Sequence, residues 1–300
     1  MPAPAAAVDP ESLLRRLLPG QPARMRAALA WLALPGHHLL GLQDPRYPPL
    51  LRQAPHPPPA LFVDGDPDLL WRPAVAVVGS RGASAGGGDN ARHFSTALCR
   101  AGVAITSGLA AGIDASAHQA ALATPGGITL AVLGTGPDLA YPRRHAALRE
   151  RIAAQGAVVS EHPPGTAARA WHFPARNRII AGLSLGTLVV EAALRSGALI
   201  TARLAAEAGR EVFAIPGSIH QPQARGCHRL IREGAALVET PDEVLAGIAP
   251  LAARLALALG PLEDGRATPP PASARPGNAP PAMHADHHRL WKALEHDPTP

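Results

Sequence analysis

Two arginines, Arg176 and Arg178, stand in the run Phe-Pro-Ala-Arg-Asn-Arg-Ile-Ile-Ala-Gly-Leu-Ser, where the sequence predicts that a helix begins. The beginning of a helix is the positive end of its dipole, so cations are unfavourable there unless an anion lies nearby. That anion is either an internal carboxylate, with Glu161 and Glu191 as candidates, or a bound phosphate. The two arginines point to different sides of a helix, so one can reach a pocket while the other forms an internal ion pair.

A second candidate anion site is the glycine-rich turn at residues 82–88. Gly79, Ser80 and Arg81 connect a strand-like run to this turn, and a helix is expected to begin near residue 89. Backbone amides at a strand-to-helix turn can hold a phosphate, although a purely structural turn has the same composition. The turn lacks both the G-x-G-x-x-G spacing and the Lys-Ser/Thr pair of a Walker A loop, which disfavours a dinucleotide or triphosphate site.

Small residues also follow the next strand-like run, where Ser107 and Gly108 stand. With Gly79 to Arg81 they are expected to form two walls of one anion pocket. Asp114 and His118 are four residues apart and share a helix face. No third ligand has a matching spacing, so we predict no metal site and expect Asp114 to cap that helix.

No catalytic group stands out from the pattern. The serines lack the Gly-x-Ser-x-Gly elbow of hydrolases, and Cys227 and His228 are sequence neighbours that are not expected to face each other. The two cysteines, Cys99 and Cys227, lie far apart, without the spacing of a disulfide framework or a zinc site. We therefore expect a protein that is not an enzyme and that needs no cofactor.

The overall charge is positive and is carried by arginine. The formal net charge is +5, and Lys292 is the only lysine. Arginine suits bidentate phosphate recognition, but a coding bias would produce the same excess, so only arginines within motifs are informative. There is no signal-peptide pattern and no apolar stretch of about 20 residues, which predicts a cytoplasmic protein.

The arrangement of apolar runs predicts a doubly wound α/β domain at about residues 71–250. Short β-branched runs without polar alternation are separated by helix-length segments, which is typical of a mostly parallel sheet covered on both faces. These runs lie at residues 75–78, 103–106, 128–133, 158–159, 187–190, 212–215 and 237–238. In such sheets, ligands bind at the carboxyl ends of the strands.

Smaller segments flank this domain on both sides. Residues 1–70 are expected to form a small helical module, with helices near 13–18 and 25–34, followed by an extended linker. Residues 251–282 are expected to be an Ala/Pro-rich linker. Residues 283–300 contain the start of a further helix and are too few to fold as a domain.

A series of ordered motifs resembles the bacterial DNA-processing protein A family, also called Smf, over about residues 44–245. The motifs are Asp44-Pro-Arg-Tyr-Pro, Leu61-Phe62, Gly79-Ser80-Arg81, the segment 107–114 with His118, Tyr141-Pro142, Ser160-Glu161, the segment 173–184, Val190-Glu191-Ala192, Ser196-Gly197, Thr201-Ala202, Gly209-Arg210 and Pro216-Gly217. The run from Phe173 to Ser184 is the most specific of them. The resemblance implies an extended Rossmann-like fold, a homodimer, binding of single-stranded DNA and loading of the RecA recombinase during natural transformation or homologous recombination.

The resemblance also implies a DNA pocket in this sequence. Phosphates would be bound by Gly79, Ser80, Arg81, Ser107 and Gly108, opposite an edge formed by Arg176, Asn177 and Arg178. Phe173 would stack on a base, as aromatic residues do in single-strand binders. Asp114, Glu161 and Glu191 would support the pocket.

The sequence departs from the family in three places. Many members have a lysine just before the Phe-Pro pair, where this chain has Ala170-Trp171-His172, so a contact to the DNA backbone is either missing here or supplied by Arg169. Gly226-Cys227-His228 replaces a Gly-Thr-Asn turn, which leaves the role of this turn open. Residues 286–294 resemble the first helix of a winged-helix-like module that then stops.

One enzymatic alternative shares the predicted fold. Nucleotide hydrolases of the phosphoribohydrolase type also combine an arginine-bearing helix start with a glycine-rich strand end. Their signature Pro-Gly-Gly-x-Gly-Thr-x-x-Glu supplies a catalytic acid. The corresponding turn here, residues 193–202, has no acid before Glu207, which disfavours this reading.

Overall fold

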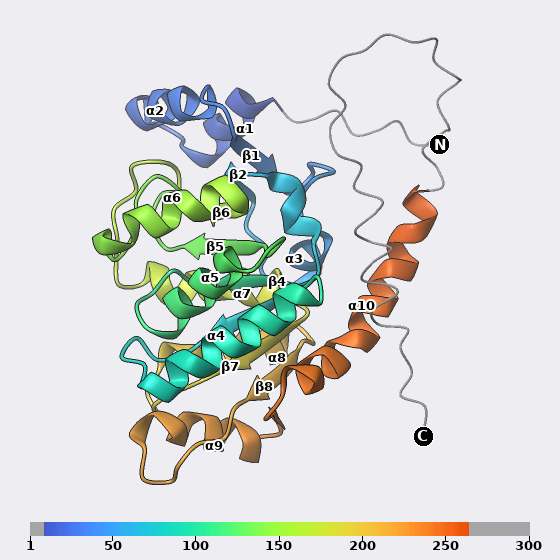
Figure 1. Ribbon diagram of the computed structural model, residues 1–300. Coiled ribbons are helices and arrows are strands. Elements are labelled where there is room, and N and C mark those ends of the chain that lie inside the picture. Colours follow the sequence, from blue (N-terminus) through green and yellow to red (C-terminus); the bar gives the residue numbers. More distant parts are fainter. Residues whose placement is uncertain (1–8, 264–300) are drawn as a thin grey trace.

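The computed structural model describes residues 9–263, which form a nine-stranded sheet with helices on both faces (Figure 1). The strand order is β1-β2-β6-β5-β4-β3-β7-β8-β9. Strands β3 to β9 run parallel to one another, whereas β2 pairs antiparallel with both β1 and β6. The strands are β1 (His37–Gly41), β2 (Ala60–Gly65), β3 (Ala74–Val78), β4 (Ala104–Ser107), β5 (Thr129–Leu133), β6 (Ala157–Ser160), β7 (Gly186–Val189), β8 (Glu211–Ala214) and β9 (Ala236–Leu237).

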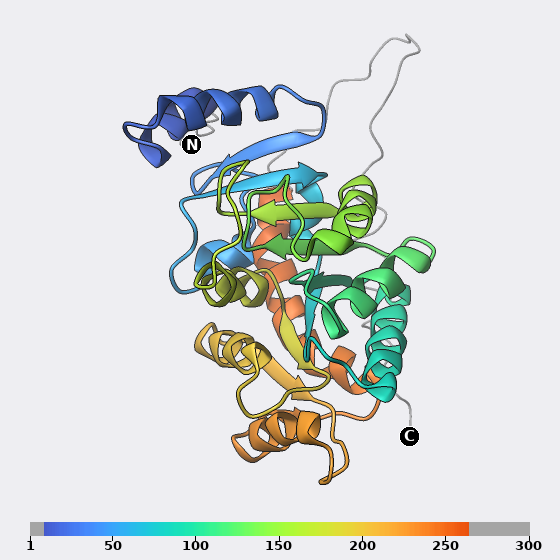
Figure 2. The ribbon, with the colours of Figure 1, turned by 90° about the vertical axis from the view of Figure 1, so that its left-hand side faces the viewer.

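The helices divide between the two faces of the sheet. Figure 2 shows α4 and α5 on one side of the strands and α7 and α8 on the other, and the contacts between α4 and α5 and between α7 and α8 agree with this view. The helices are α1 (Pro10–Leu17), α2 (Pro22–Leu32), α3 (Pro49–Gln53), α4 (Ala85–Arg100), α5 (Ile113–Ala123), α6 (Ala146–Gln155), α7 (His172–Gly182), α8 (Gly197–Glu207), α9 (Arg225–Arg232) and α10 (Pro241–Glu263).

Strand β3 lies inside the sheet, between β4 and β7, and packs against both helical layers. Its side chains alternate, as they must in any strand. Ala76 and Val78 pack in the cluster that contains Ile180 of α7, whereas Val75 and Val77 pack in the cluster that contains Phe94 of α4. Because both faces are covered, the strand is apolar throughout, which confirms the predicted doubly wound, mostly parallel, Rossmann-like fold.

The topology reverses between β3 and β7. From β3 the chain builds β4, β5 and β6 outward on one side, then returns to add β7, β8 and β9 on the other. The crevice at the carboxyl ends of the two strands next to such a reversal is where doubly wound folds bind ligands. Residues 79–82 follow β3 there, and residues 190–196 follow β7.

Each of the seven predicted strands is confirmed, and its two ends lie within one residue of the predicted ones. The N-terminal segment, however, differs from expectation. The helices α1 and α2 are present, yet the expected linker contains β1, α3 and β2. Strand β2 joins the sheet through β6, so the sheet begins well before residue 71. Leu61, Phe62 and Val63 of β2 are fully buried or nearly so, because the α/β core continues under them.

At the other end, helix α10 continues to Glu263, into the segment expected to be a linker. Leu251, Ala252 and Leu255 of this helix pack against the core cluster that contains Val244 and Ile248, which explains why helical structure extends beyond residue 250. The rest of the expected linker and the predicted helix at 286–294 lie outside the described residues. Among the described helices, none combines the length and apolarity needed to cross a membrane.

Candidate functional site

The switch point between β3 and β7 holds a cleft of about 650 Å³. One wall is the loop after β3, residues 79–82, and the other walls are the first turns of α7 and α8. Its lining includes Gly79, Ser80, Arg81, Phe173, Arg176 and Asn177 from the sequence-based set. The structure therefore brings these six residues to one crevice. We call it the switch-point cleft.

An arginine and two aromatic rings meet in this cleft. The guanidinium carbon of Arg81 lies 5.8 Å from the centre of the Phe173 ring, within cation–π range. The ring of Tyr141 lies 4.9 Å from that of Phe173, tilted by 38°. No carboxylate pairs with Arg81 in the described part of the chain. Its positive charge is therefore available to a ligand.

Arg195 is a second open cation in the cleft, and it was not singled out from the sequence. It is exposed, lines the cleft at the start of α8, and is recorded in no hydrogen bond or ion pair with the described residues. The next residue, Ser196, caps α8 by accepting a bond from the Ala198 amide at 3.3 Å. The sequence pattern that could have identified Arg195 is the Arg-Ser-Gly triplet ahead of an apolar helix, because it places a cation at the positive end of a helix dipole.

Arg176, by contrast, is part of the interior. Its side chain is 5% exposed, and Nη1 donates to the carbonyl of Gly108 at 2.8 Å and to the carbonyl of Val132. Burial lowers its pKa to about 10, against the opposing effect of Asp114, so the group stays charged at neutral pH. The Nη1 group of Arg176, which the sequence suggested for a phosphate, thus donates to carbonyls at the ends of β4 and β5 instead.

The position of Arg176 within its helix also corrects the dipole argument. Helix α7 begins at His172, about one turn before the predicted start. Pro174 falls in the first turn, where a missing N–H breaks no helical hydrogen bond. Arg176 and Arg178 therefore lie in the second turn, where the dipole effect has largely faded.

Asp114 organises the loop after β4. Its Oδ2 accepts hydrogen bonds from the amides of Gly108 at 3.1 Å and Ala110 at 3.3 Å, so it does not cap α5, whose N-cap is Gly112. Burial raises the pKa of Asp114, and the neighbouring Arg176 opposes this. A Cβ on Gly108 would come within 2.5 Å of the Arg176 guanidinium, which is why glycine is needed there.

Ser107 and Gly108, the second predicted wall of the pocket, are engaged within the protein, so the structure does not support their predicted role on phosphates. Ser107 is 0% exposed, and its hydroxyl donates to the carbonyl of Val77 at 2.6 Å. The Gly108 amide is already bound by Asp114. Neither residue lines the switch-point cleft.

Arg178 forms the internal ion pair that the sequence offered as one alternative. Its Nη1 and Nη2 donate to the two carboxylate oxygens of Glu161 at 2.9 and 2.6 Å. Its Nε donates to the carbonyl of His56 at 3.0 Å, which ties α7 to the N-terminal segment. Arg178 does not line the cleft, so its predicted role at the edge of the DNA pocket is not supported.

Glu191 occupies the helix start that was predicted to hold phosphate. Its carboxylate accepts bonds from the amide of Ser84 at 3.0 Å and from the Ser84 hydroxyl, and no arginine pairs with it in the described residues. A Cβ on Gly87 would lie 2.2 Å from the Glu191 carboxyl carbon, so glycine at this position leaves room for the carboxylate. Ser84 itself caps α4 through the Gly87 amide at 3.0 Å.

The loop after β3 is held in place by its neighbours. The Ser80 amide donates to the carbonyl of Glu191 at 2.8 Å, and the Ile113 amide donates to the carbonyl of Ser80 at 3.2 Å. Gly112 has φ of +79°, and a Cβ there would lie 2.2 Å from the Ser80 carbonyl oxygen. The backbone amides of Arg81 and Gly82 have no recorded partner among the described residues and remain free for a ligand.

Two more predicted residues lie at the borders of the cleft. Asn177 lines it and donates from Nδ2 to the carbonyl of Gly197 at 3.3 Å, which fixes α7 against the start of α8. Arg169 lies beyond the cleft, in a neighbouring pocket with Arg24 and His172. Its guanidinium carbon is 5.4 Å from the ring centre of Trp171.

The buried titratable groups do not form a catalytic set. Burial raises the pKa of both Cys99 and Cys227 to about 11, so both are neutral thiols at pH 7. Burial lowers the pKa of His118 to about 3, and its Nδ1 lies 2.7 Å from Thr129 Oγ1. Among residues 9–263, no cluster of three His, Cys, Asp or Glu side chains is arranged to hold a metal ion.

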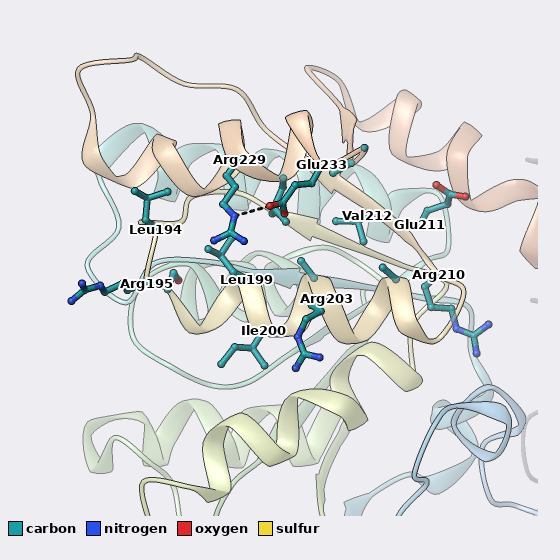
Figure 3. A pocket seen from close by; sticks show the side chains of 16 residues that line it. Leu194, Arg195, Leu199, Ile200, Arg203, Arg210, Glu211, Val212, Arg229 and Glu233 are labelled. Atoms are coloured by element: carbon teal, nitrogen blue, oxygen red, sulfur yellow. Dashed lines mark hydrogen bonds and ion pairs between the residues drawn. The ribbon is translucent and has the colours of Figure 1, made fainter.

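A second groove, of about 610 Å³, lies between α8 and α9 (Figure 3). It shares Arg195 with the switch-point cleft, but its other arginines are engaged. Arg203 pairs with Glu207, and Arg229 pairs with Glu233 at 2.8 Å. The segment Gly226-Cys227-His228, whose role was open, lies in the first turn of α9. The Gly226 amide donates a hydrogen bond to the carbonyl of Ala192 at 2.7 Å, and a Cβ on Gly226 would clash with that carbonyl.

Comparison with known proteins identifies relatives over most of this fold. Residues 38–249 match the family model of DNA recombination-mediator protein A. Protein Smf of Escherichia coli is 51% identical over 222 residues, which cover 74% of this chain and 59% of that protein. The chain therefore matches less than two thirds of the length of this relative.

Two solved structures are similar to the chain. The X-ray structure of DNA processing protein A from Streptococcus pneumoniae has a TM-score of 0.70 and 43% identity, covering 80% of this chain and 83% of that one. A structure reported for the single-stranded DNA binding mode of DNA processing protein A from Helicobacter pylori has a TM-score of 0.62 and 27% identity. It covers 69% of this chain and 94% of that one.

Proposed function

The chain belongs to the DNA recombination-mediator protein A family, and on that premise we propose that it binds single-stranded DNA in the switch-point cleft. The observation that carries the proposal is the pairing of two open arginines with an accessible aromatic ring. Arg81 and Arg195 have no carboxylate partner among the described residues, and Phe173 lies beside Arg81. Single-strand binders combine positive charge for the backbone with a ring for the bases.

Each group in the cleft has a distinct role under this proposal. Arg81, Arg195 and the free amides of residues 81 and 82 bind phosphates. Phe173, supported by Tyr141 at 4.9 Å, stacks on one base. Because phosphates carry no sequence information and stacking suits every base, binding is sequence-independent. Arg176, Asn177 and Asp114 shape the cleft from beneath.

The helix starts determine where the strand can bind. Glu191 already occupies the positive end of α4, so a phosphate is excluded from it by charge repulsion. The first turn of α8, which follows Arg195, has no acidic residue. A phosphate therefore binds on the α8 side of the cleft, where the helix dipole and the guanidinium act together.

The proposal is tested by titrating a labelled oligothymidine at two salt concentrations. We expect binding that weakens as salt is raised, because bound phosphates release counterions. Arg81→Ala should weaken binding at least several-fold. The matched control is Arg100→Ala, which removes the same charge from the exposed end of α4, about 24 Å along that helix from its start. If the wild-type protein does not bind at low salt, the proposal is wrong.

We further propose that the protein acts by binding and is not an enzyme. Asp114 is the one carboxylate among the lining residues of the cleft, and two backbone amides already bind it. A phosphoribohydrolase needs an available acid. Incubation with nucleoside monophosphates should therefore release no free base, and release of base at a rate above the spontaneous one would favour the hydrolase instead.

Loading of RecA and formation of a homodimer are the remaining parts of the proposed function, and both are proposed from the resemblance to the family. The protein should accelerate RecA filament formation on DNA coated with a single-strand-binding protein. Light scattering should give a particle of twice the 30.9 kDa chain mass. Unchanged filament kinetics, or a monomer at micromolar concentration, would overturn the respective part.

A further inference from the structure

Trp171 is an exposed aromatic residue that the proposed function has not used. Its side chain is 64% exposed, the largest exposed fraction of any aromatic residue that the structure describes. It stands at the N-cap of α7, two residues before Phe173. Large apolar side chains left in water cost free energy unless something covers them, so an exposed tryptophan beside a binding cleft is a candidate contact.

The surroundings of Trp171 repeat those of Phe173. The guanidinium carbon of Arg169 lies 5.4 Å from the Trp171 ring centre, as that of Arg81 lies 5.8 Å from the Phe173 ring centre. Arg169, like Arg81, is exposed and has no carboxylate partner within the described residues. The chain thus presents two arginine–aromatic pairs whose rings are two residues apart, with Arg169 on the same segment as the rings and Arg81 on the loop after β3.

The ring of Trp171 contacts one anchored side chain, that of His172. It lies edge-on to His172 at 5.6 Å and 82°, and His172 is stacked on His162 at 4.0 Å. The Nδ1 of His172 lies 2.9 Å from the carbonyl of Gly134, which fixes that ring at the end of β5. A fixed platform loses little conformational entropy when a base stacks on it.

Beyond Trp171 lies a third pocket, of about 580 Å³, between the N-terminal helices and residues 161–172. Ala170 and Phe173 line the switch-point cleft, whereas Arg169 and His172 line this pocket, so residues 169–173 form the ridge between the two. The acid in the pocket, Glu161, is already paired with Arg178, and Arg24 adds a second cation. The pocket is therefore electropositive, and the ridge of residues 169–173, which includes the exposed Trp171, separates it from the cleft.

We propose that Trp171 and Arg169 form a second subsite for the same DNA strand. On this proposal, which rests on the proposed function, one base stacks on Phe173 in the cleft and the strand then crosses the ridge. A following base stacks on Trp171, and Arg169 binds the adjoining phosphate. A single strand is the occupant because the surface alternates rings and unpaired guanidinium groups, which is the pattern that stacked bases and phosphates require.

The subsite is tested by comparing oligothymidines of about 4 and about 16 nucleotides, the range of known single-strand site sizes. We expect Trp171→Ala to weaken binding of the long oligomer by about 5- to 150-fold, the effect of losing one base–aromatic stack. Binding of the short oligomer, which the cleft accommodates, should be unchanged. Trp171→Phe should restore most of the loss, and Phe173→Ala should weaken both lengths.

A direct readout accompanies the affinities. Photocrosslinking of the wild-type protein to a long oligomer containing a halogenated uracil should attach a base to Trp171. Trp71→Phe is the matched control, since Trp71 is held through its Nε1 by the carbonyl of Arg46, away from the cleft. Thermal unfolding of Trp171→Ala should match the wild type, because the side chain is exposed.

The possible outcomes separate the two proposals. If neither length binds the wild-type protein, the proposed function fails and the subsite fails with it. If both lengths bind but Trp171→Ala binds them as tightly as the wild type, only the subsite is overturned. Equal weakening at both lengths would make Trp171 part of the first cleft, which also contradicts a separate subsite.

Discussion

Two pairs of arginines lie near the same cleft, and they differ in what compensates their charge. Arg176 and Arg178 on α7 are satisfied within the protein, by strand-end carbonyls and Asp114 in one case and by Glu161 in the other. Arg81 and Arg195 lie on loops that follow β3 and β7, and no carboxylate pairs with them within the described residues. The first pair builds the site, and the second pair is left for a ligand.

The contrast arises from position in the fold. Helix α7 crosses over the ends of β4 and β5, where exposed carbonyls converge and a buried cation can bind them. The loops at the switch point lie beyond the carboxyl ends of β3 and β7, and their arginines Arg81 and Arg195 are exposed to solvent. An arginine in a specific motif can therefore belong to the scaffold, as Arg176 and Arg178 do, and its partners show which role it has.

The largest expected effect is on stability, from Arg176→Met. Removing this guanidinium leaves Asp114 and two carbonyls buried without their cation, which should lower the free energy of unfolding by about 3–5 kcal/mol. Chemical denaturation measures this. Arg81→Met, the matched change at an exposed site, should shift it by less than about 0.5 kcal/mol. Equal stability of the two variants would show that the interior assignment of Arg176 is wrong.

A smaller effect is expected for the ion pair between Arg178 and Glu161. Both groups are largely buried, and the contact is bidentate, so a double-mutant cycle with Arg178→Met and Glu161→Gln should give a coupling of about 1–3 kcal/mol. DNA affinity of the single variants should stay close to that of the wild type. A large loss of DNA affinity, together with no coupling energy between Arg178 and Glu161, would show instead that Arg178 contacts the DNA.

The interior should also have a pH signature that the cleft lacks. Because His118 is neutral in the fold, with a pKa of about 3 against 6.5 when unfolded, the unfolded chain binds a proton first as the pH falls. The free energy of unfolding therefore keeps the full contribution of neutral His118 above pH 6.5. Between pH 6.5 and pH 3 this contribution falls by up to about 1.4 kcal/mol per pH unit. The measurement is the free energy of unfolding against pH, for wild type and His118→Gln. Parallel curves would contradict the assignment.

Much of the fold could be predicted from the sequence, because buried parallel strands are short, β-branched and apolar on both faces. Strand β1, His-His-Leu-Leu-Gly, has two polar residues and follows directly on a helix, so it carries no such signal. The partners of Arg176 could not be predicted either. Val132 is 44 positions away, and only the packing of α7 over β5 brings its carbonyl to the guanidinium.

The glycine turn was the most instructive difference in the site. A phosphate and a carboxylate make the same demands on a helix start, so the composition of residues 82–88 could not distinguish a ligand from Glu191. Arg195 was overlooked for the converse reason, since one arginine before a serine cap is unremarkable without its neighbours. Its significance comes from lining the same cleft as Arg81.

The most direct test of the central claim is the salt dependence of DNA binding when both open arginines are removed. For Arg81→Ala combined with Arg195→Ala, the slope of log affinity against log salt should fall by about 1.4, since each phosphate contact on a single strand contributes about 0.7. Unfolding should be unchanged. Arg100→Ala combined with Arg151→Ala removes the same charge elsewhere and should keep the slope. An unaltered slope in the cleft variant would contradict the account.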